Sequence, residues 1–275
     1  MRLTAALLAI SALFLLTVPA TAETGLLDRS VKTDSESHRY KVYVPTEWKP
    51  AWRYPVIVFL HANGRQGTDG SLQLAGGSAA SALATVFGYK GGFPAVVIFP
   101  QAAADHSWAT PQMEEMVSKQ IDETVREFHG DVDRIYLMGH SMGGSGALRL
   151  AARWPDRFAA VAESSGWTTT SESASKAITD LERATIPYLS TQDPFAALAT
   201  ILIHVPIWVF HGDADETVPV EQSRQLVAAL RKQHADVHYT EYSGSTHTET
   251  GAKMTSEKEF IPWLLSQRRL RPALR

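Results

Sequence analysis

The sequence predicts an α/β fold in which a doubly wound, mostly parallel sheet carries helices on both faces. Short apolar runs alternate with longer stretches of helical periodicity along the 275 residues. This alternation is typical of parallel strands joined by crossover helices. No internal repeat, charge run or low-complexity tract marks a linker. We therefore expect one domain over residues 23–275, after a short leader.

Seven segments have the composition and periodicity of strands. The first and the last alternate apolar with other residues, and the last is typical of a strand near a sheet edge. The five between them are continuously apolar, as expected for strands buried on both faces. The predicted strands are residues 40–44, 55–60, 95–99, 134–138, 158–162, 207–210 and 237–242.

Five stretches have apolar residues at the three-to-four spacing of an amphipathic helix. Pro111 opens the second, where a first-turn proline is tolerated, and Pro262 predicts a kink or a later start in the last. Residues 168–202 are the least regular and predict a loop-helix excursion, too small for a second domain or a large lid. The predicted helices are residues 78–87, 111–128, 142–154, 220–234 and 257–265.

The first 22 residues have the three-part pattern of a secretory signal peptide. Arg2 supplies the basic start, residues 5–18 the apolar run, and residues 20–22 the small side chains that a signal peptidase reads. The run is shorter than the ~20 residues of a membrane-spanning helix. We expect cleavage after Ala22 and a secreted or periplasmic protein with no membrane span.

Composition excludes several classes of protein. The chain has 26 Lys and Arg against 29 Asp and Glu, a net charge of −3, and so lacks the basic excess typical of nucleic-acid binding. It has no cysteine, which excludes disulfides, thiolate metal sites, iron–sulfur clusters and a cysteine nucleophile. We expect no metal and no organic cofactor. The sequence does not predict an oligomeric state.

A glycine-rich turn gives the strongest functional signal. The predicted strand 134–138 runs directly into Gly-His-Ser-Met-Gly-Gly at residues 139–144, and a helix follows at once. This G-x-S-x-G pattern between a strand and a helix is that of a nucleophile elbow. Side chains at positions 139 and 143 would collide with neighbouring backbone in so tight a turn. Ser141 is therefore the predicted nucleophile, at a helix N-terminus that favours developing negative charge.

A serine nucleophile needs a base and an orienting acid, which follow it in the order Ser, acid, His when it sits on such an elbow. The strand 207–210 ends in a loop with three carboxylates, Asp213, Asp215 and Glu216. We predict Asp215 as the acid, with Asp213 capping the turn and Glu216 facing solvent. His247 is the only histidine after the last predicted strand and is the predicted base.

Two backbone N–H groups should stabilise the oxyanion, one from Met142 and one from the loop after the strand 55–60. Asn63 is the preferred second donor and Ala62 the alternative. Trp108 and Trp167 each follow a predicted strand. Their indoles either line a substrate pocket or pack loops against the body of the protein.

These motifs resemble the α/β-hydrolase superfamily over about residues 40–265. More narrowly, they are similar to secreted esterases related to feruloyl esterases, polyhydroxybutyrate depolymerases and enzymes of the phospholipase/carboxylesterase type. The resemblance implies an α/β-hydrolase fold with little or no lid, and it places the triad acid of the His-Gly-x-x-Asp-x-x-Val-Pro motif at Asp215. The family usually has His-Gly where this chain has His61-Ala62, which leaves open whether Ala62 or Asn63 donates. The carriers are residues 60–64, 99–101 with Trp108, 139–144, 211–215 with 218–219, and His247.

The resemblance implies a serine esterase that forms an acyl-enzyme on small aryl, phenolic or polyester-type substrates. The partner would be a small or polymeric ester and not a nucleic acid. Three alternatives stay open: an exported serine peptidase of the same fold, an acyltransferase to an acceptor other than water, and a non-catalytic binding module.

Overall fold

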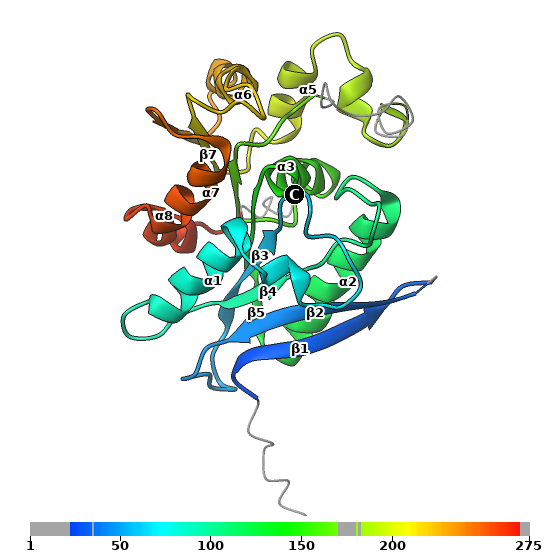
Figure 1. Cartoon of the computed structure of the whole chain (residues 1–275), viewed down its shortest axis with the longest axis vertical. Coiled ribbons are helices and arrows are strands. Elements are labelled where there is room, and N and C mark those ends of the chain that lie inside the picture. Colours follow the sequence, from blue (N-terminus) through cyan, green and yellow to red (C-terminus); the bar gives the residue numbers. More distant parts are fainter. Residues whose placement is uncertain (1–22, 35, 170–179, 181–182, 270–275) are drawn as a thin grey trace, which may run out of the picture.

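Figure 1 shows the computed structural model of the chain, which describes residues 23–34, 36–169, 180 and 183–269. The predicted signal peptide lies outside the described residues, so its cleavage stays a prediction. None of the described helices has the length and apolar character needed to cross a bilayer.

The strands form one eight-stranded sheet in the order β1-β2-β4-β3-β5-β6-β7-β8. The pairs β1–β2 and β2–β4 are antiparallel, and the five other neighbouring pairs are parallel. The predicted α/β fold with a mostly parallel sheet is therefore confirmed. The strands are β1 (Gly25–Lys32), β2 (Ser37–Val44), β3 (Tyr54–Leu60), β4 (Val96–Phe99), β5 (Gly130–His140), β6 (Ala160–Ser164), β7 (Ile207–Gly212) and β8 (Val237–Tyr242).

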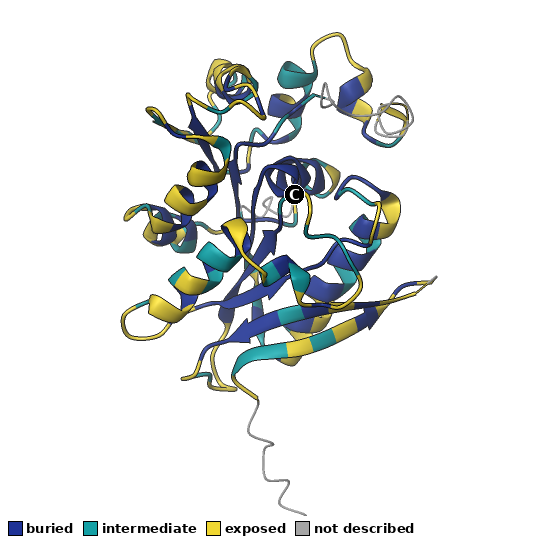
Figure 2. Ribbon diagram, in the orientation of Figure 1, coloured by how far each residue is buried: buried dark blue, intermediate teal, exposed yellow. Residues whose placement is uncertain are grey.

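Helices cover both faces of the sheet (Figures 1 and 2), because successive side chains of each buried strand point to opposite sides. Val56 and Val58 of β3 pack into a core shared with α2, α3, α5 and α6. Ile57 and Phe59 pack into a second core shared with α1, α7 and α8. The helices are α1 (Gly77–Gly88), α2 (Pro111–Glu127), α3 (Met142–Arg153), α5 (Pro194–Ile201), α6 (Glu221–Lys232), α7 (His247–Ser256) and α8 (Phe260–Ser266), with short 3-10 turns at Leu72–Leu74 and Pro187–Ser190.

Strand β1 is a strand that was not predicted from the sequence. It pairs only with β2 at the edge of the sheet, and most of its side chains are exposed or half-buried. An edge strand of this kind needs no continuous apolar run, so its sequence reads as a polar lead-in. Strand β6 begins two residues later than predicted, at Ala160.

The predicted helices are present, with one addition near the C-terminus. Helix α7 begins at His247, where the sequence analysis placed a loop. Thr246 and Glu249 form a capping box at its start, a signal that the sequence contained. Pro262 lies in the first turn of α8, so the later start is the correct alternative. The predicted excursion at residues 168–202 lies partly outside the described residues, and its described part contains α5.

The carboxyl ends of the parallel strands gather the residues singled out in the sequence. Asn63 follows β3, Ser141 follows β5, Asp215 follows β7, and His247 follows β8. In open α/β sheets this edge is where ligands bind.

The loops after β7 and β8 meet at Gly212. A Cβ at this glycine would lie 2.0 Å from the backbone oxygen of Ser245. Two backbone hydrogen bonds link the same loops, from Asp213 to Tyr242 at 3.2 Å and from Ala214 to Ser245 at 3.2 Å. This contact fixes the loop that carries Asp215 relative to the start of α7.

We expect Gly212→Ala to lower the free energy of unfolding by about 2–3 kcal/mol, because a methyl group cannot fit against fixed backbone without displacing it. Urea-induced unfolding measures this loss. Gly88→Ala is the matched control, since nothing lies within 4 Å of its Cβ position at the end of α1. Equal unfolding midpoints for the two variants would contradict the assignment of Gly212 as a close-contact position.

Candidate active site

Ser141 occupies a strained turn between β5 and α3. Its backbone has φ 58° and ψ −122°, a conformation that residues other than glycine rarely adopt. Its N–H donates to the Ser164 carbonyl at 2.8 Å, and its carbonyl accepts the N–H of Ser145 at 3.0 Å. A Cβ on Gly143 would lie 2.0 Å from the Leu60 carbonyl oxygen, which explains the glycine at that position. The turn therefore presents the serine at the first residues of α3.

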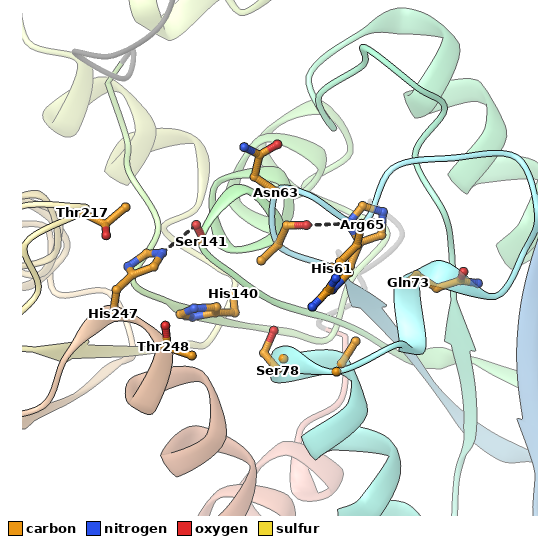
Figure 3. Close-up of a pocket in the computed structure, with 14 residues that line it drawn as sticks. His61, Asn63, Arg65, Gln73, Ser78, His140, Ser141, Thr217, His247 and Thr248 are labelled. Atoms are coloured by element: carbon orange, nitrogen blue, oxygen red, sulfur yellow. Dashed lines mark hydrogen bonds between the residues drawn. The ribbon is translucent and has the colours of Figure 1, made fainter.

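The structure brings together the three side chains that the sequence analysis assigned to acyl transfer (Figure 3). His247 Nδ1 lies 2.7 Å from Asp215 Oδ2, and His247 Nε2 lies 2.8 Å from Ser141 Oγ. An ionised carboxylate only accepts hydrogen bonds, so Nδ1 carries the proton and donates it. Nε2 is then free to accept the hydrogen bond from the Ser141 hydroxyl. This arrangement fits a serine activated by a histidine base.

Asp215 is held ionised by several donors. The backbone N–H groups of Thr217 and Val218 both donate to Oδ1 at 2.9 Å. His211 Nε2 lies 3.3 Å from Oδ2. Burial alone would raise the pKa of this carboxyl, but the hydrogen bonds from His211, His247 and Val218 hold it well below its usual range. Asp215 therefore carries a negative charge against His247.

A buried chain of polar groups continues behind Asp215, and the sequence analysis missed it. His211 Nδ1 lies 2.7 Å from Ser223 Oγ, which donates to Glu163 Oε1 at 3.1 Å. Burial raises the pKa of Glu163. Burial opposes the charging of His211, but the hydrogen bond to Asp215 and the charge of Glu163 raise its pKa overall. The place of His211 in the motif after β7 was visible in the sequence. Its proximity to Glu163 of β6 and Ser223 of α6 was not.

The two other carboxylates of this loop lie away from His247. Asp213 is exposed, and its Oδ1 accepts the backbone N–H of Gly244 at 2.6 Å. It thus braces the contact between the loops after β7 and β8. Glu216 is exposed to solvent. The exposure of Glu216 agrees with its predicted place, whereas the hydrogen bond of Asp213 goes to the loop after β8 and not to its own turn.

Hydrogen bonds of the His61 side chain hold the loop after β3 in place. The Nδ1–H of His61 donates to the Ala62 carbonyl at 2.8 Å, and its Nε2 accepts the N–H of Ala102 at 3.0 Å. Burial lowers the pKa of His61 to about 4, so the ring is neutral. Among the described residues, no acceptor binds the backbone N–H of Ala62 or Asn63. Both N–H groups therefore stay available as candidate oxyanion donors, with that of Met142 at the start of α3.

Neither tryptophan lines the cavity at Ser141, and Trp108 is buried, which corrects the pocket-lining alternative for Trp108. Trp108 is 1% exposed, and its Nε1 donates to the His61 carbonyl at 3.0 Å. Gly146 of α3 makes room for it, since a Cβ there would lie 2.5 Å from the Trp108 Cβ. Trp167 packs against the apolar core, and its backbone N–H donates to Ser145 Oγ at 2.8 Å. The Trp108 indole follows the packing alternative, because helix α3 packs closely over it. Trp167 is half-buried, and its role in substrate binding stays a prediction.

A cavity of about 330 Å³ opens at Ser141. Ala62 and Asn63 line it, as expected for residues near a reacting carbonyl. It also contains residues to which the sequence analysis gave no role in the site. Most of them adjoin predicted site residues, whereas Gln73 and residues 76–79 come from the 3-10 turn and the start of α1. These additional lining residues are His61, Arg65, Gln73, Gly76–Ala79, His140, Thr217 and Thr248. Within the described ranges, no three His, Asp or Glu side chains are grouped to hold a metal ion.

Solved structures of hydrolases are similar to this chain. A thermostable esterase shares 30% identity with a TM-score of 0.72, over 89% of this chain and 63% of that chain. A ferulic acid esterase shares 16% identity with a TM-score of 0.67, over 87% and 97%. The acylaminoacyl peptidase of Pyrococcus horikoshii shares 18% identity with a TM-score of 0.63, over 92% and 43%. The last two likenesses concern the fold alone.

Sequence comparison adds a fungal relative and a family. A protein of Arthroderma benhamiae named "Uncharacterized secreted protein" is 26% identical over 220 residues, which cover 76% of this chain and 23% of that protein. This chain thus spans about a quarter of the fungal relative and less than two thirds of the thermostable esterase. The profile of the prolyl oligopeptidase family, peptidase family S9, matches residues 101–267, more than half of the chain. The chain therefore belongs to the prolyl oligopeptidase family and has the α/β-hydrolase fold.

Proposed function

We propose that the protein hydrolyses carboxylic esters through an acyl-enzyme formed on Ser141. The observation that carries this proposal is the hydrogen-bonded chain from Ser141 Oγ through His247 to Asp215, with distances of 2.8 Å and 2.7 Å. The 30% identity with a thermostable esterase supports an ester as the substrate. Small aryl or phenolic esters and polyester fragments are the expected classes.

The reaction follows from this geometry in two halves. His247 Nε2 takes the Ser141 proton as Oγ attacks the ester carbonyl, and Asp215 stabilises the imidazolium. The N–H groups of Met142 and of Ala62 or Asn63 stabilise the oxyanion. His247 then gives its proton to the departing alcohol oxygen, which leaves the acyl group on Ser141. Water, deprotonated by His247, attacks the acyl carbonyl, and the acid product leaves as Ser141 regains its proton.

A second histidine next to the base has to stay neutral for this mechanism. The ring of His140 lies 4.8 Å from that of His247, centroid to centroid, and is buried. Burial and then the neighbouring His247 lower the pKa of His140 to about 3. At neutral pH, His140 thus adds no positive charge against the imidazolium that forms on His247.

Hydrolysis of peptides is the second candidate, because the matching family is named for a peptidase. Rates on aryl esters, feruloyl esters, hydroxybutyrate oligomers and aminoacyl amides, measured side by side, separate the two. Ester rates well above the amide rates support the esterase, and the reverse order supports the peptidase. Product analysis with added alcohols tests acyl transfer to an acceptor other than water.

We also propose that the protein is exported as a single domain starting at Glu23. The support is the N-terminal sequence pattern and the printed name of the fungal relative, which describes that protein as secreted. N-terminal sequencing of the protein from its native host tests the proposed cleavage. A mature chain that starts at Met1 would contradict it.

The proposed triad predicts unequal effects of two neighbouring aspartates. Asp215→Asn should lower kcat on a phenyl ester by about 10⁴-fold, because the amide favours the wrong His247 tautomer. Asp213→Asn, the matched control, keeps an oxygen for the Gly244 N–H and should stay within a few-fold of the wild type. Ser141→Ala should abolish turnover and labelling by a fluorophosphonate. Similar losses of kcat in the two aspartate variants would show that Asp215 is not the acid of the triad.

Burial of His140 predicts a loss of stability in mild acid. The unfolded chain protonates this histidine below its ordinary pKa of 6.5, whereas the folded chain does so only near 3. Lower pH therefore favours unfolding, by about 1.4 kcal/mol per pH unit from this residue. His140→Asn should remove that share of the slope in urea unfolding between about pH 6 and about pH 4.5. His204→Asn, at an exposed histidine, should leave the slope unchanged. Identical slopes in the wild type and His140→Asn would refute this account.

A further inference from the structure

The cavity at Ser141 contains a positive charge without a counter-ion. The Arg65 side chain lines the cavity, and its Nη2 lies 3.4 Å from where a Cβ on Gly76 would stand. Within the described part of the chain, no carboxylate forms an ion pair with Arg65. Asp69, the acidic residue of the same loop, is engaged elsewhere, since its Oδ1 accepts from Ser71, Leu72 and Gln101.

The start of helix α1 faces the same part of the cavity. Residues 76–79 line it, Gly76 offers no side-chain cap, and the first turn contains no acidic residue. The first N–H groups of a helix lack intrahelical acceptors and carry a partial positive charge. The positive charge of Arg65 adds to the positive potential of this helix start, so an anion bound between the two would be stabilised by both.

Ser78 supplies an independent sign of a missing ligand. The residue is 6% exposed, and its hydroxyl has no hydrogen-bond partner among the described residues. It nevertheless lines the cavity, on the side of α1 (Figure 3). Buried hydroxyl groups are normally hydrogen-bonded. The Ser78 hydroxyl is therefore available to donate a hydrogen bond to a ligand in the cavity.

The position of this cluster relative to His247 assigns it to one half of the substrate. His247 protonates the departing alcohol, so the alcohol lies on the His247 side of Ser141. Figure 3 shows His247 and Thr217 on one side of Ser141 and Arg65 on the other. The cluster of Arg65, Ser78 and the first N–H groups of α1 therefore faces the acyl chain.

We propose that this cluster binds a carboxylate at the far end of the acyl chain, so that the preferred substrates are half-esters of short dicarboxylic acids. A guanidinium binds a carboxylate with two parallel hydrogen bonds, which suits this ligand. The inference rests on the proposed ester hydrolysis and names its substrate class.

The test compares two esters of equal length, phenyl hydrogen glutarate and phenyl pentanoate, which differ in the terminal carboxylate. The measured quantity is the ratio of their kcat/KM values from phenol release, with spontaneous hydrolysis subtracted. We expect the wild type to prefer the glutarate, and Arg65→Gln to lower the ratio about tenfold or more, as for loss of a charged hydrogen bond. Arg65→Lys should keep part of the preference, and Ser78→Ala should lower it less than Arg65→Gln. Arg231→Gln removes an exposed arginine on α6 and is the matched charge control.

An unchanged ratio in Arg65→Gln would overturn the inference while leaving ester hydrolysis intact. Binding of free glutarate to the Ser141→Ala variant, by calorimetry, gives a readout that needs no turnover. We expect glutarate to bind, and the added Arg65→Gln change to weaken it about tenfold or more. Absence of binding, or equal binding by both variants, also overturns the inference. If the wild type hydrolyses neither ester, the proposed ester hydrolysis fails. The binding of glutarate then decides alone whether the cluster is a carboxylate site.

Discussion

Two close approaches of backbone to backbone hold the site together. At Gly143 the missing Cβ lets the start of α3 contact the carbonyl at the end of β3, so the turn of Ser141 and the loop of Asn63 share one fixed contact. At Gly212 the same device joins the loops after β7 and β8. Neither contact can adjust by a change of side-chain rotamer, because both partners are backbone atoms. The hydrogen bonds between Ser141, His247 and Asp215 depend on this registration of four loops.

Acidic and basic side chains alternate along a buried chain at the site. Glu163 lies behind His211, and His211 lies behind Asp215, which in turn accepts from His247. The neighbours of His211 and Asp215 favour the charged forms of these two residues, so charges that would be costly in isolation are tolerated inside the fold. His140 is outside this alternation and stays neutral. A positive charge on His247 thus meets a carboxylate on one side and an uncharged ring on the other.

The sequence could predict what local chemistry determines. The glycines around Ser141 identify the turn by themselves. The order of strands points to His247 and to a loop with three carboxylates, among which the motif around Asp215 favours that residue. The capping box of Thr246 and Glu249, which marks the start of α7, is also visible in the sequence. Trp108 could not be placed, since its burial depends on Gly146 of a helix that packs over it. Arg65 and Ser78 could not be paired either, because only the folded sheet brings the loop after β3 against the start of α1.

The positive charge of Arg65 in the acyl half of the cavity would also reduce an electrostatic repulsion during the reaction. A substrate carboxylate near the reacting carbonyl would repel the oxyanion that forms there. Two unit charges about 8 Å apart repel by on the order of 2 kcal/mol at an effective dielectric constant of about 20, which slows the reaction by more than tenfold. Arg65 and the start of α1 would cancel this repulsion by neutralising the carboxylate. The same groups would attract no neutral acyl chain, so a cluster that assists one substrate class offers little to the other.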